Sequence, residues 1–360
     1  MKMTEHQITE IEFFRSRPGL LTDCRDGSSA RDGIYKVIKA ALDFMSKESG
    51  KDVILRLEGQ NVLVSAYGVG ITDPEEQDRI LFGPAFAGMM DAENYVRHRR
   101  SYYYNGFPAY FINILSADYT FTSFHDGLQY SVNCHKGILA EEKECPTKER
   151  NGVELCFTLD SKIFKDYSFN TAHVIQAIKY TVARHEGLRV SFDGDIYHYE
   201  DGLLGLLKDE VGEKALYEPI HLCEEGIELA FTHIDEPVTE IVSFCNTVHT
   251  WDGGSHVNAL EDVLPRYLKT FLAGKLSSIN PMNGLICYFG INLLDMMFGN
   301  GGDTVYAEHM WEYDSDFNKN NGNKITDEVE SFMNVILSRL KTGSIRDTTE
   351  LFLLQPVTAS

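Results

Sequence analysis

Two groups of side chains in this sequence have types and spacing that could do chemistry. His249 and His256 flank Asp252, and imidazole and carboxylate groups close together can bind a metal ion. Residues 102–104 are three successive tyrosines, which could stack on the base of a ligand or pack in a core or an interface. No Ser/His/Asp nucleophile signature, P-loop or dinucleotide fingerprint accompanies either group. We therefore favour packing for the tyrosines, and the histidines require a structural context before any metal is assigned.

Length and charge limit the classes of protein to consider. The chain has 360 residues, the size of two ordinary domains. Its 33 Lys and Arg against 54 Asp and Glu give a net charge of −21, which repels phosphate and argues against direct nucleic-acid binding. Asp195–Glu240 holds 13 acids and two bases, which indicates a solvated acidic face or, less favoured, a partner-binding surface. Residues 97–100 (Arg-His-Arg-Arg) form a basic cluster, which indicates a solvated loop or, less favoured, a docking point for an acidic partner or a phosphate.

Cysteine content and hydropathy favour a cytoplasmic location. The seven cysteines are an odd number and include no CxxC pair, which indicates free thiols in a reducing compartment. The first residues carry acids where a secretory leader needs an apolar core, and no run of about 18 apolar residues occurs. We therefore expect a cytoplasmic protein without a membrane span.

Hydrophobic periodicity predicts the elements that must position any site. Ile34–Met45 has apolar residues at helical spacing, and Val53–Leu57 and Val62–Ser65 alternate as two strands. Residues 193–194 (Asp-Gly) predict a tight hairpin, whereas Pro108–Leu115 fits helix and strand equally. Further helices are predicted over His173–His185, Leu203–Val211, Asn258–Leu272 and Asp327–Leu340, strands over Tyr119–Phe124, Leu128–Asn133, Val153–Thr158, Ile227–His233 and Leu285–Leu293, and an irregular segment over Met296–Asn323. Hairpins in both halves indicate α+β layers.

Four segments, in order, resemble one known family. Arg15–Gly19 (RSRPG) is similar to its RKRPG segment, Tyr197–Gly202 (YHYEDG) to HYEGG, Ser243–His256 (SFCNTVHTWDGGSH) to SFVNNINTxEGGTH, and Gly284–Phe298 (GLICYFGINLLDMMF) to GLxAVxSVKVPDPxF. The family is the ATPase region of the DNA gyrase B subunit and its type IIA topoisomerase relatives. Because four ordered matches are more specific than one, the resemblance extends over Ile11 to Phe298.

The resemblance implies a fold and its domain limits. It implies an α+β protein with a Bergerat-type (GHKL) α/β sandwich over residues 1–217, a transducer-like domain (ribosomal S5 domain 2-like) over 218–345 and a tail over 346–360. The family's Toprim domain and cleavage core would follow, and we expect neither in a chain that ends at Ser360, either free-standing or truncated. In this family the turn that matches His249–His256 has structural hydrogen bonds, so we expect no metal site.

ATP hydrolysis on this fold requires a carboxylate base and an oxygen ligand for Mg²⁺, which the family carries on one helix in an ExxxN-like pattern. The resemblance places Lys36 at the base and Ala40 at the metal ligand. A lysine with a pKa near ~10.4 is protonated at neutral pH and cannot accept a proton from water, and alanine offers no oxygen. Asp43 is spaced to form an exposed ion pair with Lys39, and it is a less favoured candidate for a replacement base. We therefore expect no catalytic residue of the family's kind.

The residues that would recognise adenine are also replaced. The family's DDGRGIP-like segment corresponds to residues 66–72, where Ala66 stands for the adenine-binding Asp and Tyr67 for the next acid. Val153 stands for the pocket threonine of the GTxVxF segment. A pocket without these donors and acceptors loses about a thousandfold or more in affinity. The turn itself is kept, so the degenerate pocket also includes Gly68, Gly70 and Ile71.

The two groups that would hold the phosphates are altered as well. The family's GGLHGVG-like lid corresponds to residues 102–109, which keep only Gly106 and add tyrosines and a proline that lacks a backbone donor. The lysine of the family's QTK motif, which reaches the γ-phosphate, corresponds to Asp303. An anion thus stands where the chemistry needs a cation.

Together the replacements predict a gyrase-B-like protein that has lost ATP binding and hydrolysis, with no cofactor. We expect it to act as a binding, regulatory or dimerising module, as a homodimer or as a hybrid dimer with a topoisomerase subunit. The alternative is a divergent ATPase subunit of a type IIA topoisomerase that still binds ATP and Mg²⁺. A third, less favoured hypothesis is an acidic DNA mimic that occupies a basic groove on another protein.

Overall fold

The computed structural model describes two compact units. Described are residues 10–18, 35, 37–39, 41–42, 45, 51–68, 107–165, 167–224, 226–250, 253–271, 280–292, 296–299 and 304–307. The units are Met1–Glu200 and Asp201–Ser360. The boundary that the resemblance implies, near residue 217, falls within the second unit, and the functional domain limits stay a prediction.

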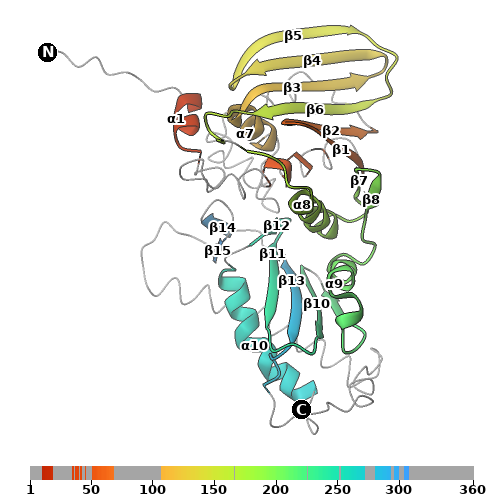
Figure 1. Cartoon of the computed structure of the whole chain (residues 1–360), viewed down its shortest axis with the longest axis vertical. Coiled ribbons are helices and arrows are strands. Elements are labelled where there is room, and N and C mark those ends of the chain that lie inside the picture. Colours follow the sequence, from red (N-terminus) through yellow and green to blue (C-terminus); the bar gives the residue numbers. More distant parts are fainter. Residues whose placement is uncertain are drawn as a thin grey trace, which may run out of the picture. The chain divides into compact units, whose positions relative to one another are not determined.

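An eight-stranded sheet forms the centre of the first unit (Figure 1), with strand order β5-β4-β3-β6-β2-β1-β7-β8. Neighbouring strands are antiparallel except β1 and β7, which are parallel. The strands are β1 (Asp52–Glu58), β2 (Asn61–Tyr67), β3 (Ser116–His125), β4 (Leu128–His135), β5 (Ile138–Pro146), β6 (Gly152–Leu159), β7 (Arg189–Phe192) and β8 (Asp195–Tyr197), and the helices are α1 (Glu10–Ser16), α7 (Phe107–Leu115) and α8 (Thr171–Arg184).

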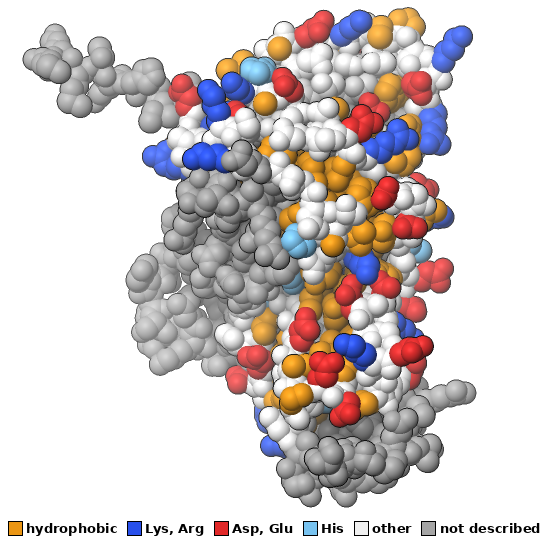
Figure 2. All heavy atoms as spheres, in the orientation of Figure 1, with side chains coloured by type: hydrophobic (Ala, Val, Ile, Leu, Met, Phe, Trp, Pro, Cys, Tyr) orange, Lys and Arg blue, Asp and Glu red, His pale blue; other side chains and the backbone are white. Residues whose placement is uncertain are grey.

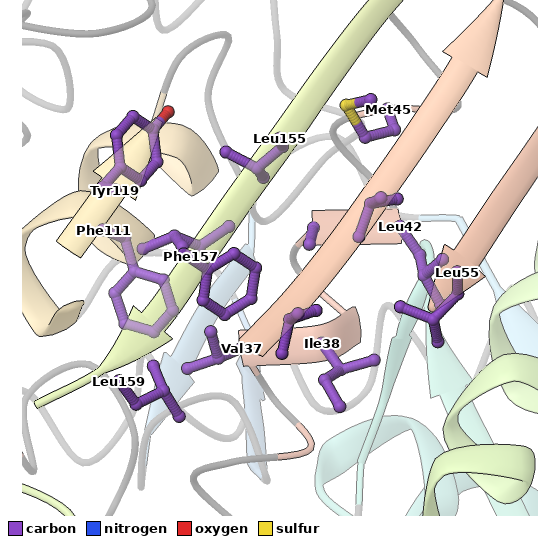
Figure 3. Packing of buried hydrophobic residues seen from close by; sticks show 14 of the residues in the cluster. Val37, Ile38, Leu42, Met45, Leu55, Phe111, Tyr119, Leu155, Phe157 and Leu159 are labelled. Atoms are coloured by element: carbon purple, nitrogen blue, oxygen red, sulfur yellow. The ribbon is translucent and has the colours of Figure 1, made fainter. Parts of the chain in front are cut away.

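The core of this unit lies on one face of the sheet (Figure 3). Successive residues of a strand point to opposite faces, and the inward positions of β2 and β6 are apolar and buried. The predicted helix over residues 34–45 is helical at its described positions, and its apolar face packs into the same core. Among the residues that share this core are Val37, Ile38, Ala41, Leu42, Met45, Val62, Val64, Leu155 and Phe157, all between 0% and 1% exposed.

The second unit is built on a five-stranded sheet, with strand order β12-β11-β13-β10-β9. The strands are β9 (Ile220–Glu224), β10 (Ile227–His233), β11 (Glu240–Cys245), β12 (Val248–His249) and β13 (Leu285–Ile291), and the helices are α9 (Leu203–Val211), the 3₁₀ turn η1 (Gly212–Lys214) and α10 (Ser255–Phe271). Strand β13 is buried along its whole length, and the apolar face of α10 packs in the same core. The two lysines of the acidic segment pair with glutamates, Lys208 with Glu218 at 2.5 Å and Lys214 with Glu236 at 3.3 Å.

Several predicted elements are confirmed and others need correction. The hairpin at residues 193–194 joins β7 to β8, with Asp193 at φ 52° and Gly194 at φ 91°. The periodicity of Pro108–Leu115 fitted helix and strand equally, and the structure shows that this segment lies in the helix α7 (Phe107–Leu115). The prediction of an irregular segment over Met296–Asn323 is wrong at its start, because β14 (Met296–Gly299) and β15 (Thr304–Ala307) pair there as a short hairpin. The predicted helix Asp327–Leu340 lies outside the described residues.

Candidate functional site

The structure brings together two residues of the predicted adenine pocket. Ala66 on β2 and Val153 on β6 are directly opposite each other in the antiparallel register. Both side chains are 0% exposed and belong to the apolar core cluster of the first unit. Because inward-facing positions recur every second residue, the strand pattern aims both at the helix that carries Val37 and Ala41. Neither side chain can donate or accept a hydrogen bond, so this pair offers an adenine base contact area and no polar recognition.

Tyr67 is the next residue on β2 and therefore faces the opposite side of the sheet. Its ring lies under the Arg150 guanidinium, 3.6 Å from the ring centroid, in a cation–π contact. The Gly68 N–H donates to the Asn151 carbonyl oxygen at 3.0 Å, which fixes the end of β2 against the start of β6. The tyrosine at the second acid position is thus held by the arginine and is turned away from the core.

Gly152 explains how closely β2 and β6 approach at this point. A Cβ atom on Gly152 would lie 2.5 Å from the Ala66 carbonyl oxygen and 3.0 Å from the Tyr67 Cα. Any larger residue would push the strands apart at the pocket position. Gly152 directly precedes Val153 and matches the glycine of the family's GTxVxF segment. The sequence gives no signal for the role of Arg150, because its contact with Tyr67 depends on which strands become neighbours.

The other predicted site residues lie outside the described residues. These are Lys36, Ala40, Gly70, Ile71, Gly106 and Asp303, together with Asp43, the basic cluster 97–100 and the tyrosines 102–104. The replacement of the base, the metal ligand, the lid and the γ-phosphate cation therefore stays a prediction. Of the predicted pocket, the structure describes Ala66, Tyr67, Gly68 and Val153, and their assignment to adenine recognition also stays a prediction.

A chain of buried polar groups occupies the segment that resembles SFVNNINTxEGGTH. The Thr250 hydroxyl donates to the Ser243 carbonyl oxygen at 3.0 Å, and its oxygen lies 2.6 Å from Ser243 Oγ and 3.2 Å from His256 Nε2. The His256 ring is 0% exposed and stacks on Phe289, with centroids 5.9 Å apart. Burial lowers the pKa of His256 to about 4, so the imidazole is neutral at neutral pH. This arrangement tethers the β11–β12 turn to the start of α10.

The metal hypothesis for this turn finds no support in the described part of the chain. Asp252, which stands between the two histidines in the sequence, lies outside it. Within the described residues, no three His, Cys, Asp or Glu side chains gather closely enough to hold a metal ion. His256 instead points at a threonine hydroxyl, which is a structural contact.

A second buried histidine is held in one tautomer. His233 Nε2 donates to the Pro281 carbonyl oxygen at 2.9 Å, so Nδ1 accepts the Tyr217 hydroxyl proton at 2.6 Å. Burial lowers the pKa of His233 and raises that of Tyr217, so both groups are neutral. The pair connects the segment after α9 to the residues before β13.

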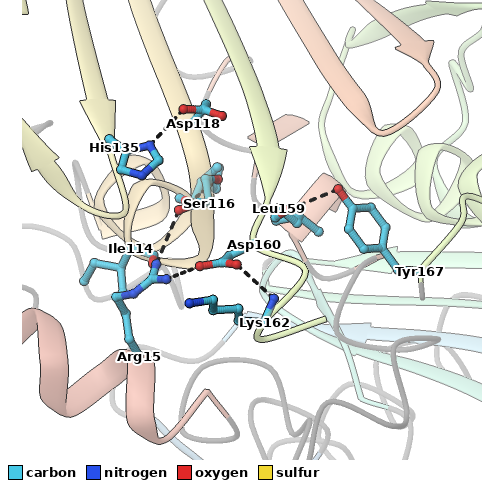
Figure 4. A network of polar contacts seen from close by, with 10 residues as sticks. Arg15, Ile114, Ser116, Asp118, His135, Leu159, Asp160, Lys162 and Tyr167 are labelled. Carbon is cyan, nitrogen blue, oxygen red and sulfur yellow. Dashed lines mark hydrogen bonds and ion pairs between the residues drawn. The ribbon is translucent and has the colours of Figure 1, made fainter. Parts of the chain in front are cut away.

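The segment that resembles RKRPG also has a structural role (Figure 4). Arg15 on α1 donates to the carbonyl oxygens of Ile114 and Ser116 and pairs with the buried Asp160 carboxylate. Burial opposes ionisation of Asp160, but the Lys162 N–H and Arg15 outweigh it and lower the pKa of the carboxyl. Arg15 thereby fixes α1 to the end of α7 and the start of β3.

Comparisons with known proteins confirm the resemblance. The family model described as DNA gyrase B matches residues 202–281. The B subunit of DNA topoisomerase 4 from Borreliella burgdorferi is 25% identical over 297 residues, which cover 81% of this chain and 49% of that protein. The B subunit of DNA gyrase from Archaeoglobus fulgidus is 30% identical over 159 residues, which cover 41% of this chain and 24% of that protein. The chain thus spans about half the length, or less, of these curated relatives.

Solved structures show the fold. The crystal structure of the B subunit of DNA gyrase from Myxococcus xanthus aligns with a TM-score of 0.67 and 20% identity, over 90% of this chain and 95% of that one. The 43K ATPase domain of Thermus thermophilus gyrase B, in complex with an aminocoumarin, aligns with a TM-score of 0.65 and 18% identity, over 96% and 93%. The chain therefore has the fold of a Bergerat-type (GHKL) sandwich followed by a transducer-like α+β domain, and it resembles the ATPase region of gyrase B. No described helix is long and apolar enough to cross a membrane.

Proposed function

We propose that this chain is a gyrase-B-like module that has lost ATP binding and hydrolysis. The observation that carries the proposal is the pair Ala66 and Val153, which lie opposite each other, fully buried in the apolar core. The family resemblance assigns these two positions to adenine recognition. A base bound there would leave its amino group and ring nitrogens without partners. Burying such groups unpaired costs about 1–3 kcal/mol each, which is enough to abolish recognition.

The proposed role is binding and regulation, as a homodimer or as a hybrid dimer with a topoisomerase subunit. The relatives are named as subunits, and the match of a gyrase B family model to residues 202–281 supports an intact transducer-like scaffold. A subunit without nucleotide chemistry would tune or block an active partner. With a net charge of −21, direct nucleic-acid binding is not part of the proposed role, and we place the protein in the cytoplasm.

One observation favours the alternative, a divergent ATPase subunit that still binds ATP. The similarity to the B subunit of topoisomerase 4 extends over 81% of the chain, which is more than the second unit alone and therefore reaches into the first unit. Such a protein would need a base and a metal ligand other than Lys36 and Ala40. It would also need to recognise adenine without a polar side chain at Ala66 or Val153.

Calorimetric titration with Mg²⁺ and a non-hydrolysable ATP analogue separates the two functions. The 43K ATPase domain of Thermus thermophilus gyrase B, titrated under the same conditions, shows that the assay detects binding. We expect no saturable heat from this chain, with folding confirmed by circular dichroism. Saturable binding tighter than about 1 mM would overturn the proposal and favour the divergent ATPase.

A further inference from the structure

The two sheets differ in how their edges are protected. The outer strands β8, β12 and β9 have 3, 2 and 5 residues, whereas β5 has 9. An outer strand pairs on one side only, so its other side presents unpaired backbone N–H and C=O groups. Short edges offer few such groups. Among the described strands, β5 is the one long edge (Figure 1). A register shift opposite Asn133 and Cys134 interrupts it at Ala140, so its regular part runs from Glu141 to Pro146.

Strand β5 is also exposed on both of its faces. Every residue from Ile138 to Glu144 is exposed, and only Cys145 is half-buried. Ile138 and Leu139 are 63% and 43% exposed, which is unusual for apolar side chains in a strand. Figure 2 shows apolar and charged side chains together along the end of the first unit where Figure 1 places β5. Both the backbone edge and an apolar contact area are therefore accessible.

The charges on β5 select what can pair with it. Glu141, Glu142 and Glu144 surround one Lys143, a net charge of −2 on the strand. A second copy of β5 would bring six glutamates against two lysines, between chains of charge −21 each. Like charges placed opposite each other across strands are destabilising, so this edge disfavours its own copy and also a phosphate backbone. An extended segment rich in Lys or Arg has the complementary charge.

We propose that β5 is a docking edge for an extended basic segment of a partner protein, which adds a ninth strand to the sheet. Main-chain hydrogen bonds to β5 supply the affinity, as in other cases of strand addition. The glutamates select the basic side chains, and apolar residues of the segment cover Ile138 and Leu139. This inference does not depend on the loss of ATP binding, because β5 and β2 are separated by three strands in the sheet order.

The test uses the full chain and a fluorescent nine-residue peptide of alternating Val and Lys, with fluorescence anisotropy and amide hydrogen exchange as readouts. A second peptide carries N-methyl groups at alternate residues, which keep the charge and remove the backbone donors. The variant E142K/E144K reverses two charges on one face of β5. The variant E213K/E240K makes the same change in net charge in the second unit, at exposed positions, and serves as its control.

We expect saturable binding of the first peptide, with slower exchange confined to the amides of residues 138–146. The E142K/E144K variant should bind about tenfold more weakly, because four units of charge change beside the peptide, whereas E213K/E240K should bind within about twofold of the parent. Equal binding of the N-methylated peptide would overturn the proposal in favour of simple charge attraction. Absence of saturable binding, or self-association of the chain through the same amides in sedimentation experiments, would overturn it as well. Unchanged circular dichroism spectra of both variants confirm that their folds are kept.

Discussion

Two groups of residues, one in each unit, lie in segments that resemble motifs of the same family. The first unit holds Ala66 and Val153, and the second holds Ser243, Thr250 and His256. In the first unit, apolar residues stand where the family motif has polar ones, and they pack in the hydrophobic core on one face of the sheet. In the second unit the polar residues are kept and bond to one another in a buried chain. The first arrangement removes the buried polar groups, and the second pairs most of them, since His256 Nδ1 is buried without a hydrogen-bond partner among the described residues.

The difference separates binding chemistry from scaffold chemistry. Polar side chains that serve a ligand are a cost to the empty protein, because they stay unpaired until the ligand arrives. Polar side chains that serve the fold are already paired and stabilise it. Replacement of the first kind with retention of the second is the pattern expected when a scaffold is kept and its ligand is lost. Substitutions at the two sites test this interpretation.

The largest effect is expected from Ala66→Asp, which returns the carboxylate that the resemblance implies. A carboxylate at this position would lie among the apolar residues of the described core, so the variant should lose about 3–5 kcal/mol of unfolding free energy at neutral pH. The core should raise the pKa of the new carboxyl, so the cost should shrink as the pH falls and the group is protonated. Urea denaturation at pH 7.5 and 5 measures both effects.

Tyr67→Asp is the matched control, because it introduces the same group one residue along, on the opposite face and beside Arg150. We expect a loss of less than about 1.5 kcal/mol for it, mainly from the ring contact. If Ala66→Asp were as stable as its control and gained ATP binding, the pocket would be open and the two units would not differ as argued.

The next effect in size is expected from Thr250→Val in the second unit. The change is nearly isosteric, but it removes the hydroxyl that contacts both Ser243 and His256, and leaves these buried groups without that partner. We expect a loss of about 2–3 kcal/mol in the free energy of unfolding. Thr247→Val is the control, because the Thr247 hydroxyl is buried with no hydrogen-bond partner within the described residues, and its removal should be neutral or stabilising. Equal losses for both variants would show that the polar chain contributes nothing specific.

A smaller effect concerns pH, and it arises from His256. Its pKa is about 4 in the folded chain and near 6.5 when unfolded, so the unfolded state binds the proton more readily. The stability that this neutral ring contributes is complete above about pH 6.5 and is lost as the pH falls toward 4. Between pH 7.5 and 5 the loss should be about 2 kcal/mol.

The comparison with His256→Leu isolates this contribution, because His233 and the carboxyl groups titrate in both proteins. The substituted chain should be less stable overall and should lose less stability between the two pH values. An unchanged pH dependence would show that His256 is protonated, or accessible to water, in the folded state.

The sequence predicted more of the fold than of the site. The buried faces of residues 34–45 and of β2 followed from periodicity, and the β7–β8 hairpin followed from Asp193 and Gly194, since these signals are local. The sequence located Ala66 and Val153 only through a family resemblance, but once they were located, their apolar nature was visible at once. The contact of Arg150 with Tyr67 and the exposure of β5 could not be predicted, because each depends on which strands become neighbours. The β14–β15 hairpin was missed because its two strands have only four residues each and the segment between Phe298 and Thr304 consists of Gly, Asn and Asp.

The smallest effect is expected from Tyr119→Phe in the first unit. Tyr119 is 1% exposed, and its hydroxyl has no hydrogen-bond partner within the described residues, beside Cys134 on the neighbouring strand. Burial raises the pKa of both groups, to about 11 for the thiol, so both are neutral. Because an unpaired buried hydroxyl costs free energy, its removal should leave stability unchanged or raise it by up to about 1 kcal/mol, as measured by urea denaturation. A loss above about 1 kcal/mol would show that the hydroxyl is paired, for instance through a buried water, and the first unit would then also keep polar groups that serve its fold.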